Sequence, residues 1–338
     1  MITNLTIKNF GPIGGLEWND VSNINLIIGR NGAGKSFLLK ALYSAMRTLE
    51  EYRRGNDPRT ATEILADKLY WTFQPDKLGE LVTKGADAAL SFKVRLDGND
   101  FSYAFGKDTT RKIAFLENLV TPRSSNSIFL PAKEVLSLHK IILRSRDIDR
   151  VFGFDDTYVD LARALSQPIS QGRMYEEFSK ARKSLAELLE GRIYYDNTVG
   201  QWSFWKGNQK FSVDVTAEGI KKISILDTLL GNRYLNSGSI VFIDEPESAL
   251  HPAAISKLMD IIAVLASAKR IQFFLASHSY FVIKKLCLIA QRDTISIPVL
   301  ARDKSGWYLA NLQDGMPENE IIDESIKLYE EEVDRVLQ

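Results

Sequence analysis

The segment GRNGAGKS at residues 29–36 carries the clearest chemical signal in the chain. It fits the pattern G-x-x-x-x-G-K-[S/T], in which glycines let backbone N–H groups wrap phosphate oxygens. Lys35 supplies the positive charge for the β- and γ-phosphates, and the Ser36 hydroxyl is a ligand for Mg²⁺. The sequence therefore predicts a phosphate-binding P-loop, whose nucleotide-binding residues are Gly29, Arg30, Asn31, Gly32, Ala33, Gly34, Lys35, Ser36 and Phe37.

A second segment, SIVFIDEPESALHP at residues 239–252, places two acids at the end of an apolar strand. Asp244 is positioned to hold Mg²⁺ together with Ser36, and the adjacent Glu245 to polarise an attacking water. Alone, such a segment is also compatible with a buried strand that ends in a capping acid. The P-loop upstream favours the functional interpretation, in which Glu245 is catalytic.

His278 follows a third apolar stretch, FLASHS at residues 274–279. A histidine at the end of such a strand can contact the γ-phosphate, whereas an isolated histidine more often has a structural role. The two preceding motifs favour a catalytic role for His278.

The elements that must position these residues follow from apolar periodicity. NINLIIG at 23–29 reads as a buried strand, and residues 36–52 show helical spacing. Residues 89–105 predict a β-hairpin around Asp97-Gly98-Asn99, and residues 155–191 predict helices that end at Gly191. In the C-terminal half, strands alternate with helices, which is typical of a parallel α/β sheet.

Composition narrows the class of protein. The chain has 338 residues, with 43 Lys+Arg, 43 Asp+Glu and one cysteine, Cys287. One cysteine excludes an internal disulfide framework and a cysteine-rich zinc site. The N-terminus lacks the pattern of a signal peptide, and the apolar runs are far shorter than the roughly 20 residues that span a membrane. We therefore expect a soluble, cytoplasmic protein that does not itself bind a membrane.

The three motifs, in this order, resemble the ABC-type ATPases. Within that group the opening LTIKNFGPI before LIIGRNGAGKS, and the form DEPESALHP, are similar to the RecF, SMC and OLD-like relatives, particularly the stand-alone bacterial AAA family ATPases. The resemblance implies an α/β P-loop NTPase fold of ABC-ATPase type, with a mixed sheet, flanking helices and a helical insertion. It implies the ligands ATP and Mg²⁺. The expected division is lobe I at 1–138, a helical insertion or lid at 139–213 and lobe II at 214–338.

In such ATPases, two heads enclose two ATP molecules, and a signature segment of one head caps the ATP of the other. The corresponding segment here contains Thr216, Ala217, Glu218 and Gly219, with alanine where the family has its signature serine. No glutamine follows the strand at 127–130, so Lys133 and Glu134 are the candidates for the glutamine-loop position. His251 replaces the aspartate of the D-loop and is expected near a dimer interface, or else merely at a helix N-terminus.

The implied function is an ATPase, slow because its signature is degenerate, that forms a homodimer or higher homo-oligomer and controls a separately encoded effector, a nuclease or toxin, in antiviral defence. The insertion lacks the heptads of a coiled-coil arm, and too few residues follow His278 for a TOPRIM nuclease domain. Two alternatives stay open: a RecF-like ATPase of DNA repair or replication, and an ATP-binding scaffold that does not hydrolyse. Basic stretches near residues 140–150 and 180–183 leave nucleic-acid binding open, although interleaved acids favour a solvated surface.

Overall fold

The computed structural model describes residues 1–338 apart from 171, 173, 197, 199, 268–269 and 338. At its centre is a six-stranded sheet in the order β14-β13-β3-β12-β11-β7. Five of these strands, from β13 to β7, are parallel to one another, and the edge strand β14 runs antiparallel to β13. Their bounds are β3 Ile24–Gly29, β7 Ser127–Leu130, β11 Ser239–Asp244, β12 Ile271–Ser277, β13 Pro298–Arg302 and β14 Trp307–Asn311.

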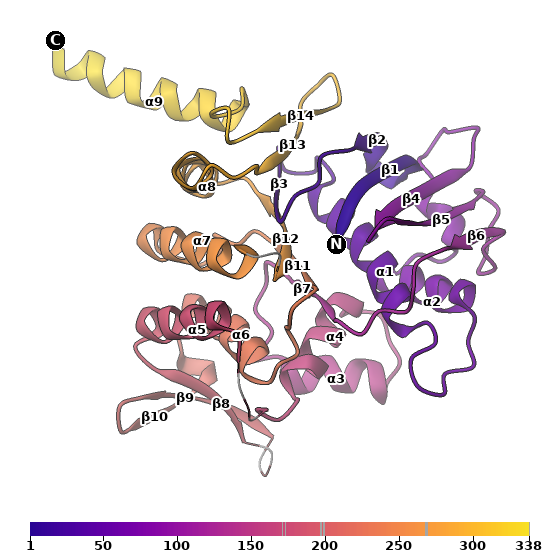
Figure 1. Ribbon diagram of the computed structural model, residues 1–338, viewed down its shortest axis with the longest axis horizontal. Coiled ribbons are helices and arrows are strands. Elements are labelled where there is room, and N and C mark those ends of the chain that lie inside the picture. The colour runs from indigo at the N-terminus through magenta and orange to yellow at the C-terminus, as the bar shows by residue number, and fades with distance from the viewer. Residues whose placement is uncertain (171, 173, 197, 199, 268–269, 338) are drawn as a thin grey trace.

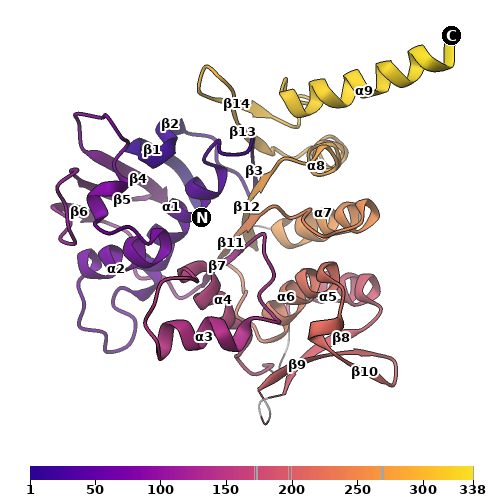
Figure 2. The same cartoon turned by 180° about the vertical axis from the view of Figure 1, so that it is seen from behind.

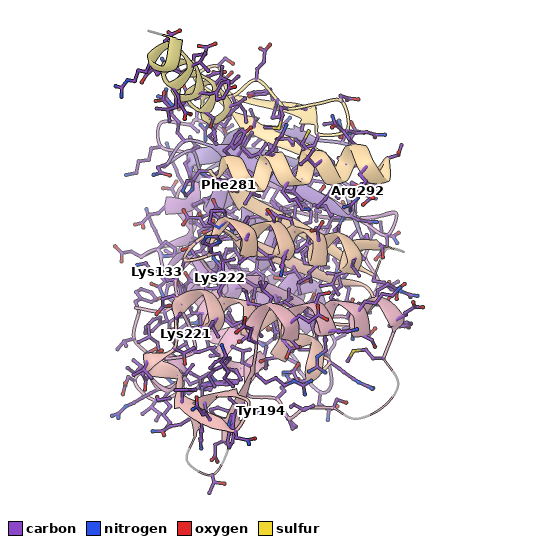
Figure 3. The ribbon with its side chains drawn as sticks, turned by 90° about the vertical axis from the view of Figure 1, so that its left-hand side faces the viewer. Lys133, Tyr194, Lys221, Lys222, Phe281 and Arg292 are labelled. Atoms are coloured by element: carbon purple, nitrogen blue, oxygen red, sulfur yellow. The ribbon has the colours of Figure 1, made fainter. Side chains whose placement is uncertain are left out.

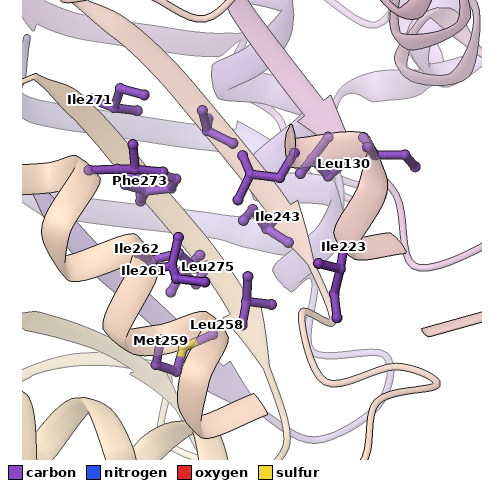
Figure 4. Packing of buried hydrophobic residues seen from close by; sticks show 14 of the residues in the cluster. Leu130, Ile223, Ile243, Leu258, Met259, Ile261, Ile262, Ile271, Phe273 and Leu275 are labelled. Carbon is purple, nitrogen blue, oxygen red and sulfur yellow. The ribbon is translucent and has the colours of Figure 1, made fainter. Parts of the chain in front are cut away.

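Helices line one side of this sheet, where α5 to α8 lie beside one another (Figures 1 and 2). Figure 4 shows how α7 packs: Leu258 and Ile262 lie against Leu275 and neighbouring apolar side chains of the strands. The sheet is buried on both faces, which explains why its strands read as continuous apolar runs. The helices are α5 Glu176–Leu189, α6 Glu218–Gly231, α7 Pro252–Ala266 and α8 Tyr280–Asp293.

The opposite side of the sheet is covered by α1 (Lys35–Glu51) and by a second, antiparallel sheet in the order β2-β1-β4-β5-β6. The predicted hairpin is confirmed: β4 pairs with β5 around Asp97 and Gly98, whose φ angles are both positive, as a two-residue hairpin turn requires. The strands are β1 Ile2–Phe10, β2 Gly14–Trp18, β4 Leu90–Leu96, β5 Asn99–Phe105 and β6 Phe115–Asn118. Helix α1 packs between this sheet and the central one.

Segment 139–213 contains helices and a third, small sheet in the order β10-β9-β8. Its first helices, α3 (His139–Asp147) and α4 (Asp156–Leu165), pack on each other, and α4 also contacts the edge strand β7. The strands are β8 Arg192–Asp196, β9 Gln201–Lys206 and β10 Gln209–Ser212. This segment is therefore mixed helix and strand, and the lobe division stays a prediction.

Helix α5 ends as expected near Gly191, but for a different reason. Glu190 adopts the left-handed conformation that usually belongs to a terminal glycine, with φ of 49°. Gly191 is needed because a Cβ there would lie 2.4 Å from the Trp205 carbonyl oxygen. Close approach of β9 therefore selects this glycine.

The remaining elements complete the two ends of the molecule. Helix α2 (Ala61–Phe73) begins with a capping box made by Thr60 and Glu63. Helix α9 (Glu320–Leu337) extends away from the body beyond α8 (Figure 1). Short 3₁₀ turns occupy Gly11–Ile13, Leu78–Leu81 and Val213–Val215. Over the described residues, no helix combines the length and apolarity needed to cross a membrane. Cys287 is buried.

A buried ionic network fastens α1 and α2 to α4. The Arg47 Nε lies 3.2 Å from the Asp160 Oδ2, and Lys68 Nζ lies 3.5 Å from the same oxygen. The Tyr43 hydroxyl donates to that oxygen at 2.8 Å, and Arg47 also pairs with Glu50. Burial alone would raise the pKa of Asp160, but the charges of Lys68 and Arg47 and the Tyr43 hydroxyl hold it below its usual range. The carboxylate therefore stays ionised at this junction.

Replacing Arg47 by methionine should leave the buried carboxylates of Asp160 and Glu50 less well compensated, because each loses a charged partner. We expect the free energy of unfolding to fall by about 3 kcal/mol in urea titrations. Arg95→Met is the matched control: the Arg95 side chain is half-exposed where it pairs with Asp100, so the unfolding midpoint should barely move. Equal losses in the two variants would contradict the role of the network.

The contribution of Asp160 depends on pH in a defined direction. Its folded-state pKa lies below the unfolded value of about 3.9, so its stabilisation is complete above that pH and is lost as the pH falls through the folded pKa. The stability difference between wild type and Arg47→Met should therefore stay constant from neutral pH to about pH 5 and narrow below about pH 4. Denaturant titrations across this range measure it; a gap that widens on acidification would contradict the assignment.

Candidate functional site

The P-loop lies where β3 ends and α1 begins. Gly32 and Gly34 have φ angles of 78° and 91°, which only glycine adopts without strain, and α1 starts at the next residue. The ammonium of Lys35 donates to the carbonyl oxygens of Gly29 and Arg30, at 2.7 and 3.0 Å. Burial lowers the pKa of Lys35, opposed by the carboxylates at 244, 245 and 247. The loop thus holds a partly desolvated cation at a helix N-terminus, which is a site for an anion.

Parallel strand pairing brings the second motif to the same place. β3 pairs with β12 and β12 with β11, so the carboxyl ends of all three strands share one sheet edge. There the Ser36 hydroxyl donates to Asp244 Oδ1 at 2.9 Å. Burial raises the pKa of Asp244, while the Ser36 hydrogen bond lowers it. One hydroxyl and one carboxylate are the hard oxygen ligands that Mg²⁺ takes when phosphate oxygens and water complete its shell.

The other acidic and histidine residues bear on whether Mg²⁺ could be held by protein groups alone. Within the described part of the chain, no group of three or more His, Cys, Asp or Glu could hold a metal by itself. Ser36 and Asp244 offer two oxygen ligands side by side, so Mg²⁺ held there would need nucleotide oxygens and water to complete its shell.

Glu245 and His278 lie side by side at the same edge. His278 follows β12, and its Nδ1 lies 3.6 Å from Glu245 Oε1 and 3.7 Å from Glu247 Oε1. The Glu245 backbone has φ of 50°, and its N–H donates to the Ala276 carbonyl at 2.8 Å. A carboxylate and an imidazole at this edge, both partly exposed, can act on a water and on a terminal phosphate.

Sequence reasoning missed Glu247. Its side chain is nearly buried, and Oε1 accepts hydrogen bonds from the Ser277 hydroxyl and the His278 N–H, at 2.8 and 3.1 Å. Glu247 therefore fixes the turn that carries His278. The available signal was its position two residues after Glu245, but nothing in the sequence indicated which strand end it would meet.

Two further P-loop contacts were also missed. Arg302, at the end of β13, donates from Nη1 to the carbonyls of Pro12 and Ala33, at 2.5 and 2.7 Å. The side chain of Arg30 forms an ion pair with Glu320 on α9. Phe37 packs its ring against Phe10 and Phe73, so only its backbone can face a phosphate. A neighbouring strand and helix thus hold the P-loop from outside.

The signature-like segment lies at the N-terminus of α6. Ala217 is its N-cap, and the Thr216 hydroxyl donates to the Ser212 carbonyl at 2.9 Å, so it is directed into its own chain. Among the described residues, no hydrogen bond or ion pair joins 216–219 to 29–37. The two segments are thus not parts of one contact within this chain.

The remaining candidates lie beside that helix or cap another. Lys133 and Glu134 line a small pocket together with Glu218, Ser248 and Ala249. Glu134 Oε1 accepts from the Ser137 N–H at 2.8 Å, and Lys133 is exposed. His251 is the N-cap of α7, where its Nδ1 accepts from the Ala253 N–H at 3.2 Å. The structure therefore gives His251 a capping contact.

The layered sheet, the P-loop and the acids at its edge define an ABC-type P-loop ATPase head. The chain belongs to the family described as "AAA domain, putative AbiEii toxin, Type IV TA system", which it matches over residues 24–284. Its fold is similar to an Smc head solved bound to the C-terminal winged-helix domain of ScpA, with TM-score 0.55, 13% identity, and coverage of 92% of this chain and 97% of that one.

Two further solved heads were found. The SMC head domain from Thermotoga maritima has TM-score 0.47 and 13% identity, covering 92% of this chain and 98% of that chain. The Smc head from Pyrococcus furiosus, solved with an extended coiled coil and the C-terminal domain of ScpA, has TM-score 0.48 and 12% identity, covering 98% of each chain. A search of curated proteins found no match.

Gly219 shows how tightly α6 meets the segment after Glu245. A Cβ at Gly219 would lie 2.7 Å from the Ala249 carbonyl oxygen, which is backbone and cannot rotate away. Gly219→Ala should therefore lower the free energy of unfolding by about 1–3 kcal/mol through overpacking. Gly106→Ala is the control, because nothing lies within 4 Å of a Cβ there. Urea titration of both decides; a neutral Gly219→Ala would show that the two segments separate freely.

Proposed function

We propose that this chain is an ATP-binding and ATP-hydrolysing head that dimerises with nucleotide. The observation that carries the proposal is the convergence at one sheet edge of Ser36 on Asp244, 2.9 Å apart, with Glu245 beside His278. The family to which the chain belongs is one of P-loop ATPases, which supports nucleotide binding. The contacts of these side chains support the residue roles proposed below.

In this proposal the P-loop N–H groups and Lys35 bind the β- and γ-phosphates, and Mg²⁺ held by Ser36 and Asp244 would neutralise phosphate charge. Glu245 orients a water and takes its proton while the water oxygen attacks the γ-phosphorus. The bond from that phosphorus to the bridging oxygen breaks, and ADP keeps the electron pair. In this proposal His278, whose backbone N–H is held by Glu247, donates to the γ-phosphate oxygens.

The signature-like segment supports a two-headed arrangement. Residues 216–219 form no hydrogen bond or ion pair with the P-loop of the same chain over the described residues, and they begin a helix whose first N–H groups lack intrahelical partners. Such a terminus suits a phosphate carried by a second copy. With Ala217 in place of a hydroxyl residue and Thr216 bonded inward, this cap contributes backbone N–H groups only, which is consistent with slow turnover.

The finer proposal is that the dimer controls a separately encoded effector, a nuclease or toxin, in cytoplasmic antiviral defence. It rests on the OLD-like sequence features and on the family, whose description names a putative toxin of a toxin–antitoxin system. The Smc head of similar fold was solved with a partner protein, ScpA. A head that cycles between one and two copies is a suitable switch for such a partner.

The test uses Glu245→Gln, which should bind ATP without hydrolysing it. We expect light scattering to show a monomer without nucleotide and a dimer with Mg-ATP, and phosphate release to fall by about 10²–10⁴-fold from wild type. Lys35→Ala is the control that should neither dimerise nor hydrolyse. If the wild-type protein dimerises with Mg-ATP but releases no phosphate, the chain is a non-hydrolysing scaffold and not an ATPase. If the wild-type protein neither dimerises nor releases phosphate with Mg-ATP, the proposal is overturned.

A further inference from the structure

Two consecutive lysines of α6 have different partners. The Lys221 ammonium donates to the Ser137 hydroxyl at 2.9 Å and pairs with Glu218 at 3.0 Å. The Lys222 ammonium instead donates to the backbone carbonyl oxygen of Glu245, the proposed catalytic base. Both side chains lie at the end of the helical layer where Lys133 is also found (Figure 3). Successive helical residues diverge in direction, so the pair reaches two separate loops.

The direction of Lys222 follows from the packing of α6. Gly219 and Lys222 are three residues apart and therefore share one helix face. At Gly219 that face touches the Ala249 carbonyl, and one turn later Lys222 reaches Glu245 in the same loop. Ile225 continues the face and lines the small pocket with Lys222, Ser248 and Ala249. The contact is thus part of a continuous seam between α6 and residues 245–249.

The acceptor is a strained position. Glu245 has φ of 50°, a left-handed conformation that is unfavourable for a residue with a side chain. Its N–H is held by the Ala276 carbonyl, and its own carbonyl accepts from the Ser248 N–H at 3.0 Å as well as from Lys222. A charged donor on this carbonyl fixes the peptide plane, and so fixes where the Glu245 carboxylate points.

The Lys222 ammonium is largely desolvated and lies near three carboxylates. Burial lowers its pKa to about 8, against the carboxylates of Glu247, Glu245 and Asp244, which raise it. The carboxylates thus offset part of the cost of burying the ammonium, and the hydrogen bond to the Glu245 carbonyl places it.

We propose that Lys222 is a positioning residue for Glu245: its bond to the Glu245 carbonyl holds the left-handed turn that aims the carboxylate at the attacking water. This role rests on the proposed ATPase function. Helix α6 then connects the signature-like segment to the catalytic base Glu245 of the same head, because Gly219 and Lys222 both contact the loop at residues 245–249.

The test is Lys222→Met, which keeps the length of the side chain and removes its donor. With Mg-ATP we expect kcat to fall by tenfold or more, because a shift of about 1 Å at a reacting group can cost 10²-fold. The KM for ATP should stay within about twofold, because phosphate binding at the P-loop is untouched. Lys222→Arg, which retains a charged donor, should recover most of the lost kcat.

Lys221→Met is the matched control: it removes a buried lysine from the same helix without touching Glu245. Its kcat should stay within about threefold of wild type. Equal losses in Lys221→Met and Lys222→Met would reduce the effect to general damage to α6 and overturn the proposal. So would a rise in KM at unchanged kcat.

Hydrogen exchange separates this proposal from the ATPase proposal. The Ser248 amide donates to the same carbonyl as Lys222, so without nucleotide it should exchange about tenfold faster in Lys222→Met and at the wild-type rate in Lys221→Met. If wild type hydrolyses ATP and Lys222→Met does so equally fast, this inference fails and the ATPase stands. If wild type does not hydrolyse, the ATPase fails, and unchanged Ser248 exchange would then overturn the positioning contact as well.

Discussion

The parallel register of β3, β12 and β11 is the constraint on which the rest of the site depends. These strands are separated by long stretches of chain, yet their pairing places three carboxyl ends at one edge. Backbone hydrogen bonds within a sheet buried on both faces fix that register. A slip would leave buried backbone N–H and C=O groups without partners and would disturb the packing of the apolar side chains. Ser36 meets Asp244 and His278 meets Glu245 as a consequence of it.

Around this edge, each segment of the candidate site is positioned by a residue that is not itself assigned a role in binding or hydrolysis. Arg302 bonds the P-loop carbonyl at Ala33 and the turn at Pro12, and Glu247 bonds the turn that carries His278. Lys222 and Gly219 hold the loop after Glu245. A site assembled from four chain segments needs such supports, because small displacements at reacting atoms are costly.

The second sheet and segment 139–213 attach to this frame through α1. One face of α1 fills the space between the two sheets, and its polar face carries Arg47 into the buried network with Asp160 on α4. Because α1 is also the helix that begins at the P-loop, movement of the phosphate-binding loop is mechanically joined to α4 through a pair of desolvated charges. Such a junction tolerates little rearrangement, since separating the charges in the interior is unfavourable.

The sequence by itself determined the P-loop, the α/β class and several elements. The P-loop pattern, the acids ending an apolar strand and the Asp97-Gly98 hairpin are local, and their physics is set by glycine conformations and apolar periodicity. Contacts between distant segments were decided only by tertiary structure. Nothing local indicates that Glu247 would meet His278, that Lys222 and not Lys221 would reach Glu245, or that Trp205 would select Gly191. Those pairings follow from which helix face packs on which strand end, and packing is a property of the whole chain.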